Sequence, residues 1–127
     1  MTPEGFPKLF AAAFSAQDGA TLAGYLADDA EVVTLTGALA EDASTARQLF
    51  DMEFAGIFAS ARLVSGKTRL RPLGPGGAVL HQRFVVIGAR DQTGAEMSRF
   101  GSVLTAVLLA RAEGWRAVSL SFSALTQ

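Results

Sequence analysis

The hydrophobic period of this sequence changes once, near Arg62. After Arg62, apolar and polar residues alternate in long runs, and glycine-containing turns at 73–77 and 91–94 separate these runs. A period of two is typical of strands, and turns this short join antiparallel neighbours. Two further apolar runs, at 100–110 and 115–124, continue the series. The second half of the chain therefore predicts an antiparallel meander of long strands.

The first half of the chain has helical periods instead. Apolar residues over 6–14 recur at spacings of three and four, as on one face of an amphipathic helix. Asp18 is placed to cap a second, short helix that reaches Ala27, and a third helix is expected at about 42–59. The β-branched stretch 31–36 predicts a strand between them. Three helices followed by a meander predict an α+β fold with the helices on one side of the sheet.

Length and charge limit the class of protein. The chain has 127 residues, half of them hydrophobic, so we expect one domain over 1–127 with a packed core. The net charge of −1 provides no overall field that would attract nucleic acid or an anionic membrane. The sequence shows neither a signal peptide nor an apolar run of about 18 residues. We therefore expect a cytoplasmic protein with no nucleic acid and no membrane among its partners.

Several kinds of site are excluded by residue types that are missing. The chain has no cysteine, which rules out disulfides, thiolate catalysis and zinc–thiolate sites. It also has no cluster of metal-ligating residues, no dinucleotide-binding glycine fingerprint and no P-loop. The sequence thus predicts neither a metal nor a cofactor.

Four short segments give the chain a familiar pattern. They are FAAAFSAQD at 10–18, YLADDAEV at 25–32, FAGIF at 54–58 and EGWRAV at 113–118. In this order and spacing the chain resembles the NTF2-like superfamily and, within it, the SnoaL-like small proteins related to the SgcJ/EcaC group. The resemblance implies a cystatin-like cone in which a strongly bent sheet surrounds three helices. It also implies a pocket at the wide end of the cone and a dimer.

The resemblance limits the chemistry as well. Ketosteroid isomerases share this fold, but their oxyanion-hole tyrosine matches Phe10 here, which has no donor. Their general-base aspartate matches Thr34, which is no base near neutral pH. Many SgcJ-like proteins carry a histidine on the third helix where this chain has Phe50. We therefore do not expect steroid isomerisation by that mechanism.

Glu53 is the candidate catalytic residue. It lies near the middle of the apolar face of the third expected helix. A carboxyl group desolvated there would have a raised pKa, which suits a general acid or base. In the alternative interpretation, Glu53 reaches solvent or a partner such as Tyr25.

A ligand pocket is expected between the third helix and the meander. If Arg71 pairs with Val79, then Thr68 lies opposite Gln82 among apolar neighbours, where two polar groups could orient a small ligand. In the alternative interpretation, Thr68 and Gln82 bond each other within the core. Phe50, Phe54 and Phe84 are then core residues as well. The predicted lining is Tyr25, Thr34, Phe50, Phe54, Thr68, Gln82 and Phe84.

The opposite face of the sheet has a different character. The same pairing places Lys67, Arg69, Arg71, His81 and Arg83 together on it. This stripe is either an anion site, a solvated face or the rim of a dimer contact. The last two strands are apolar on both faces, so a second copy of the chain is expected to cover the face away from the helices.

Three functions fit these features. The first is a pocket protein that binds a small, neutral, largely apolar molecule without turning it over. The second is an isomerase-, cyclase- or hydratase-like enzyme on the same pocket, with Glu53 as acid or base. The third is a dimeric interaction module without an active pocket. A deep pocket would exclude the third function, and Glu53 pointing into the pocket would favour the second over the first.

Overall fold

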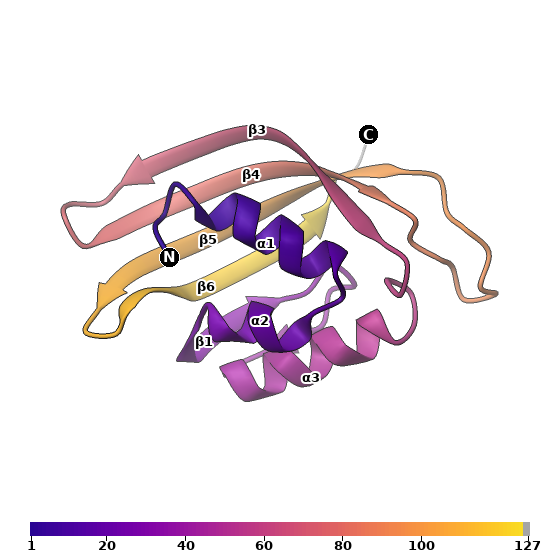
Figure 1. Ribbon diagram of the computed structural model, residues 1–127, viewed down its shortest axis with the longest axis horizontal. Helices are drawn as coiled ribbons and strands as arrows, with labels where there is room; N and C mark the ends of the chain where they lie inside the picture. Colours follow the sequence, from indigo (N-terminus) through magenta and orange to yellow (C-terminus); the bar gives the residue numbers. More distant parts are fainter. Residues whose placement is uncertain (126–127) are drawn as a thin grey trace.

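Three helices precede the long strands, as the change in period predicts (Figure 1). This computed structural model describes residues 1–125, so the predicted domain extends two residues beyond the described part. The helices are α1 (Phe6–Ser15), α2 (Gly19–Gly24) and α3 (Ala43–Phe54). The strands are β1 (Leu26–Val33), β2 (Leu39–Ala40), β3 (Arg62–Pro72), β4 (Gly77–Ile87), β5 (Phe100–Arg111) and β6 (Gly114–Ala124). The predicted α+β fold is confirmed.

The strands form one sheet in the order β2-β1-β6-β5-β4-β3. Consecutive pairs from β3 to β6 are antiparallel, which confirms the predicted meander. The predicted pairing of Arg71 with Val79, and of Thr68 with Gln82, is also correct. Among the strands of residues 1–125, only β1 and β6 pair in parallel; the helix α3 and strands β3 to β5 lie between them in the chain.

The corner between α2 and β1 differs from the prediction. The helix ends at Gly24 and the strand begins at Leu26, although the expected boundaries were Ala27 and Glu31. The backbone N–H of Ala117 on β6 donates to the Tyr25 carbonyl at 2.9 Å, and Leu26 pairs with Ala117. Leu26 and Glu31 pair with Ala117 and Ser119 of β6, with an irregularity between them. The strand therefore begins earlier than expected, because this tertiary contact overrides the helical propensity of Leu26 and Ala27.

The third helix is shorter than expected and ends at Phe54 instead of Ala59. Beyond it, the backbone N–H groups of Gly56 and Phe58 both donate to the Glu53 carbonyl, at 3.2 and 2.8 Å, so the chain turns away from the helix axis. The Ile57 carbonyl accepts from Arg90 at 2.9 Å. Glycine is a weak helix former, and this long-range bond holds the segment in turns.

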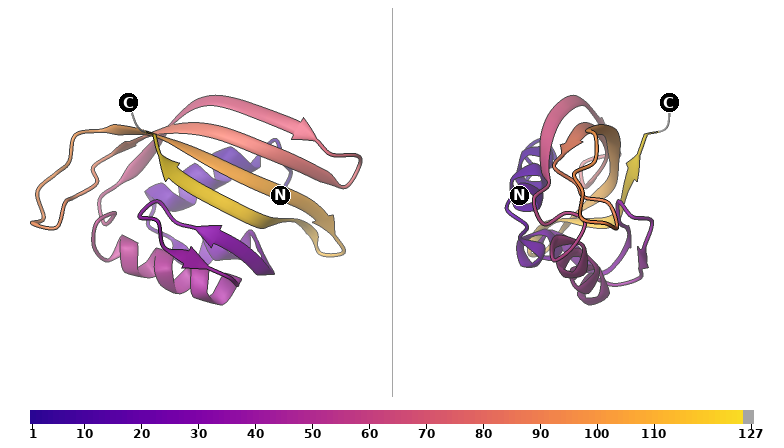
Figure 2. Two further views of the ribbon diagram at one scale, coloured as in Figure 1. Left: turned by 180° about the vertical axis from the view of Figure 1, so that it is seen from behind. Right: turned by 90° about the vertical axis from the view of Figure 1, so that its right-hand side faces the viewer.

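The helices cover the concave face of the sheet, and the opposite face carries no helix (Figures 1 and 2). The core between them is rich in phenylalanine. Phe10 and Phe14 of α1 pack against Phe122 of β6, with ring centroids 5.4 and 5.7 Å apart. Burial of these rings contributes to the hydrophobic driving force that holds the helices on the sheet.

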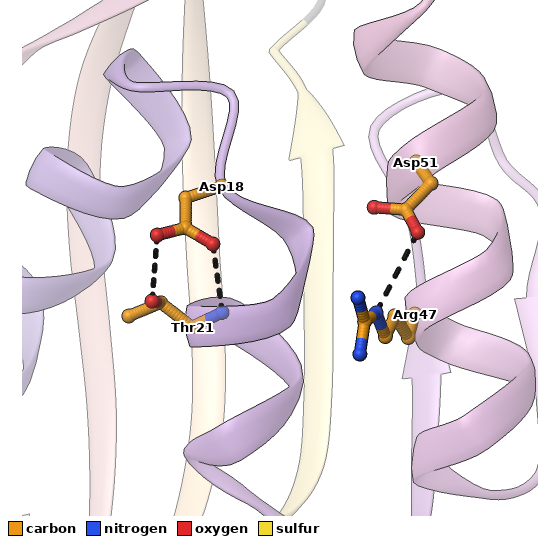
Figure 3. Close-up of polar contacts among 4 residues, drawn as sticks. All are labelled: Asp18, Thr21, Arg47 and Asp51. Carbon is orange, nitrogen blue, oxygen red and sulfur yellow. Dashed lines mark hydrogen bonds and ion pairs between the residues drawn. The ribbon is translucent and has the colours of Figure 1, made fainter.

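Two polar contacts order the short helix and its neighbour (Figure 3). Asp18 caps α2, as predicted, by accepting from the Thr21 N–H at 3.0 Å and from the Thr21 hydroxyl at 2.7 Å. These two bonds hold the pKa of Asp18 below its usual value. On α3, Arg47 and Asp51 form an ion pair one helical turn apart, with N and O 3.6 Å from each other.

Acid should weaken the fold through such caps. The pKa values of Asp18, Asp42 and Asp91 are all lowered in the folded state, chiefly by bonds from Thr21, Thr45 and Thr93. Their stabilising contribution is therefore present above the unfolded-state pKa, near 3.8, and is lost as the pH falls through the lower folded-state values. We therefore expect the urea concentration at the unfolding midpoint to decrease when the pH is lowered below about 4. Asp18→Asn keeps a hydrogen-bond acceptor that carries no charge, so acidification should lower the urea midpoint of this variant less than that of the parent. An equal decrease in the two proteins would show that the Asp18 cap does not contribute to the acid sensitivity.

Gly88 should be irreplaceable at the start of the β4–β5 connection. Its φ of +85° disfavours other residues, and an added Cβ would collide with the Ser60 carbonyl oxygen. Gly94 has the same φ of +85° but faces open space. We expect Gly88→Ala to destabilise by about 2–4 kcal/mol and Gly94→Ala by about 1 kcal/mol in chemical denaturation, because only the first adds overpacking to backbone strain. Equal losses would show that Gly88 has room.

Candidate functional site

The space expected to hold a pocket between α3 and the sheet is occupied by phenylalanine rings. Phe54 packs on Phe14 with centroids 5.1 Å apart, and Phe84 stacks on Phe10 at 6.1 Å. The exposed fractions of Phe50, Phe54 and Phe84 are 4%, 8% and 1%. The rings of α1 thus extend between α3 and β4, and these three predicted pocket residues lie in the core.

Thr68 and Gln82 bond each other, as in the alternative interpretation, but only Gln82 is buried and Thr68 is exposed. The Thr68 hydroxyl donates to Gln82 Oε1. Gln82 Nε2 donates to the carbonyls of Gly66 at 3.2 Å and Arg83 at 2.9 Å. The register of β3 against β4 shifts between Ser65 and Thr68, and the amide of Gln82 bonds the backbone at this irregularity. Both ends of the amide are used, so its role here is to stabilise the β3–β4 pairing.

Tyr25 and Glu53 are not brought together. The Tyr25 ring contacts Phe6 edge-on at 5.7 Å, at the N-terminal end of α1. Phe54, next to Glu53, contacts Phe14 near the C-terminal end of the same helix. Tyr25 is therefore not the partner of Glu53 that the sequence suggested.

The partner of Glu53 is Thr36, a residue that the sequence reasoning missed. The Thr36 hydroxyl donates to Glu53 Oε2 at 2.8 Å, and Thr34 Oγ1 lies 3.2 Å from Thr36 Oγ1. Thr34 Oγ1 also accepts from the Ala38 N–H at 3.3 Å. Since the Thr36 proton points to Glu53, Thr34 donates to Thr36, and the chain of bonds ends on the carboxylate. The sequence signal that could have indicated this contact is the pair Thr34 and Thr36 directly before Gly37.

An apolar groove adjoins this polar chain. It has a volume of about 610 Å³, and Thr36 lies on its wall. Four separate segments build it: the β1–β2 turn, the turn after α3, the residues that lead into β5, and the end of β6. Its large apolar lining residues are Leu35, Ile57, Phe58, Met97, Phe100 and Leu125.

Arg99 also lies on the wall of this groove, but two other hollows on the surface have several charged side chains on their walls. One of about 620 Å³ lies beside Asp28, Asp29, Arg111 and Arg116. Another of about 230 Å³ lies on the basic stripe between β3 and β4. Charged walls of this kind favour water or ions over an apolar ligand.

Residues 1–125 contain no group of three His, Asp or Glu side chains that could hold a metal ion. No helix in this range has the length and apolar content that a bilayer crossing needs.

Several solved structures have a similar fold. An uncharacterised protein with a cystatin-like fold from Caulobacter vibrioides superposes with a TM-score of 0.86 at 15% identity, over 97% of this chain and 87% of that one. An NTF2-like protein with a cystatin-like fold from Novosphingobium aromaticivorans gives a TM-score of 0.74 at 21% identity, over 96% and 80%. An NTF2-like protein of unknown function in nutrient uptake from Rhodospirillum rubrum gives 0.74 at 23% identity, over 99% and 100%. These likenesses confirm the predicted NTF2-like, cystatin-like fold.

At the level of sequence, the model of the SnoaL-like domain matches residues 6–127. No curated protein has a significant match to the sequence.

Phe54 and Met52 provide a test of the filled core. Phe54 is 8% exposed and Met52, on the same helix, is 66% exposed. We expect Phe54→Ala to lower the free energy of unfolding by about 3–5 kcal/mol, because it leaves a cavity among aromatic rings. Met52→Ala should change it by less than about 0.5 kcal/mol. If the Phe54→Ala protein unfolds at the same urea concentration as the parent, the Phe54 ring is not packed in the core, and the predicted pocket at this place would be supported.

Proposed function

Because the chain belongs to the SnoaL-like domain family, we propose that it binds a small, neutral, largely apolar molecule in the groove beside Thr36. The family comprises pocket proteins and enzymes built on this fold, so the ligand class must come from the walls of the groove. Of the predicted site residues, Thr34 and Glu53 bond Thr36 on the wall of the groove but do not line it themselves. The proposed site leaves Tyr25, Phe50, Phe54, Thr68, Gln82 and Phe84 to structural roles.

The single observation that carries this proposal is the apolar lining of the groove. A volume of about 610 Å³ lies in the range of small-molecule sites, and large apolar side chains from four segments converge on it. Met97 and Leu125 are 38% and 37% exposed. A ligand that covered them would gain about 25 cal/mol for each Å² of apolar surface removed from water.

The Thr36–Glu53 pair supplies a polar anchor at the wall of the groove. Within residues 1–125, the hydrogen bonds of this carboxylate use Oε2. Oε1 therefore remains an acceptor for a hydroxyl or N–H group of a ligand. Such a contact would orient a molecule whose remaining surface is apolar.

The groove can be tested with a neutral solvatochromic dye such as Nile red. Met97→Glu places a charge on the groove, and we expect it to weaken dye binding by at least about tenfold, because an unpaired charge resists burial. Met52→Glu introduces the same charge at an exposed site on α3 and should leave binding unchanged. Fluorescence titration that finds equal affinities in both variants would place the dye elsewhere and overturn the proposal.

A second candidate function is catalysis at the same place, with Glu53 as general acid or base. The observation that favours it is a half-buried carboxylate held in position by Thr36 at the edge of an apolar site. We expect Glu53→Gln to abolish turnover of any substrate while ligand affinity changes little, since shape is kept and only proton transfer is lost. Undiminished turnover in Glu53→Gln would exclude this role.

We also propose that two copies of the chain associate through the sheet face opposite the helices. Val79, Val103, Val107 and Leu109 lie on this face and are only half-buried in one copy. A second copy would cover them and bury at least about 1,000 Å² in total. Sedimentation at micromolar concentration should give the mass of a dimer, and a monomer mass would refute the association.

A further inference from the structure

The long strands and the rest of the chain differ in charge. The four long strands, β3 to β6, contain none of the twelve aspartates and glutamates of the chain. They do contain seven of its eleven lysines and arginines, namely Arg62, Lys67, Arg69, Arg71, Arg83, Arg111 and Arg116. The net charge of −1 therefore conceals a basic meander beside an acidic remainder of the chain.

Four basic side chains gather on the outer face of β3 and β4, which is the face away from the helices. Arg69 pairs with His81 and both are exposed, whereas the residues on either side of His81 are buried, so this pair projects outward. The walls of a hollow of about 230 Å³ combine this pair with Lys67, Arg83 and the half-buried Val103. Three positive charges and an imidazole thus surround one small space.

Lys67 reaches this hollow because β3 has a bulge. The register against β4 shifts between Ser65 and Thr68, so two residues, Gly66 and Lys67, lie opposite Arg83 alone. In a regular strand, Lys67 would project to the same face as Ser65, toward the helices. The buried glutamine amide described above donates to the Gly66 carbonyl at 3.2 Å and so stabilises the bulge. The bulge therefore turns a lysine toward an arginine.

No carboxylate balances these charges within residues 1–125. Lys67, Arg69 and Arg83 form no ion pair with any residue of this range. Glu31 of β1 lies on the same face of the sheet, but β1 is three strands away from β4, or about 14 Å. Like charges on facing residues destabilise a strand pair. An anion in the hollow would relieve this repulsion, so the charge pattern favours anion binding.

The imidazole of His81 is held at one of its two nitrogens. Its Nδ1 lies 3.3 Å from Oγ1 of Thr105 on β5. Within the described residues, the hydrogen bonds of this ring involve Nδ1, so Nε2 is left for a ligand. If the Thr105 hydroxyl donates to Nδ1, the proton of the neutral ring is on Nε2, which can then donate to an anion. His81 thus adds a donor to the three charges.

A larger hollow of about 620 Å³ adjoins the first. The two hollows share Arg69 and His81 on their walls. The other walls of the larger hollow are mostly apolar and come from Leu70, Arg71, Pro72, Leu73 and Val79. A molecule that occupies both hollows therefore needs an anionic group at one end and a less polar body at the other.

We propose that the outer face of β3 and β4 binds a small phosphate monoester. Its phosphate group lies in the smaller hollow, and its organic part lies in the larger one. A phosphate group carries a charge of about −1.5 to −2 at pH 7 and has three acceptor oxygens, which suits N–H donors that converge from two strands. Lys67 and Arg69 are one two-residue repeat of the strand apart, or about 7 Å. This short span matches one phosphate group and not a long polyanion.

The phosphate site is separate from the groove beside Thr36, since the two have no lining residue in common. The cations lie on β3 and β4 at one edge of the sheet, whereas β5 and β6 lie at its middle. A second copy centred on β5 and β6 would therefore leave the cations at the rim of the contact. Val79 and Val103 belong both to the hollows and to the face proposed for association, so binding and oligomeric state must be measured on the same samples.

Calorimetric titration of the full chain with phenyl phosphate tests the site, at low ionic strength so that exposed charges are little screened. We expect Arg69→Ala to weaken binding by at least about tenfold, because Arg69 lies on the walls of both hollows. Arg62→Ala removes the same charge from an exposed position on the same strand, outside both hollows, and should leave binding unchanged. Equal affinities of the two variants would overturn the proposal.

Two further probes test the two ends of the ligand. Benzoate has an aromatic body but a single negative charge, and we expect it to bind at least about tenfold more weakly than phenyl phosphate. Inorganic phosphate lacks the organic part and should also bind more weakly, because it gains nothing from the larger hollow. Equal affinities for phenyl phosphate and inorganic phosphate would overturn the assignment to a monoester and leave a simple anion site.

The remaining outcomes are equally definite. A parent protein that does not bind phenyl phosphate would refute the site, and binding to phosphatidate vesicles in that case would indicate a lipid surface instead. Sedimentation of the same samples separates the site from the association. A dimer that binds no phenyl phosphate would refute the site alone, and a monomer that binds it would support the site and refute the association. Nile red binding should be unchanged in Arg69→Ala, since the groove is elsewhere.

Discussion

Phe14 makes the contacts on which the rest of the structure depends. Its ring lies within 5.1 to 5.7 Å of Phe54, Phe58 and Phe122, and so it joins α1, α3 with its following turn, and β6. Aromatic pairs of this kind add to the large apolar area that each ring buries. Because α1 carries these rings over the middle of the sheet, the helices and the sheet share one core. The centre of the cone is consequently closed.

The closed centre explains where a site can exist. The turn after α3 carries Phe58 into the core and leaves Ile57 half-exposed, and the residues before β5 bring Met97 and Phe100 to the same end. An apolar groove forms there because its walls come from connecting segments, whose packing is less complete than that of the rings in the core. Thr36 brings the carboxylate of Glu53 to this edge.

The two faces of the sheet thus have separate tasks in the functions proposed here. The helices cover the concave face, except at the groove at its end. The outer face carries the half-buried side chains of Val79, Val103, Val107 and Leu109. A sheet that packs on helices with one face and leaves the other face open is suited to combine a ligand site with self-association.

Much of the fold could be predicted from the sequence because the signals are local. The period-two runs after Arg62, with their short turns, determined the meander and the pairing of Arg71 with Val79. Asp18 determined the start of α2, since its carboxylate is one turn from Thr21. The NTF2-like resemblance rested on short motifs spread over nearly the whole chain.

Other features were decided only by tertiary structure. Leu26 joined a strand because β6, some 90 residues later, offered Ala117 as a partner. The expected pocket closed because Phe10 and Phe14 reach Phe84 and Phe54, which no period reveals. Thr36, which bonds Thr34, meets Glu53 across a sequence separation of 17 residues. A hydrophobic pattern determines which face a residue occupies, but whether that face meets a ring, a ligand or water depends on the packing of segments that are distant in the chain.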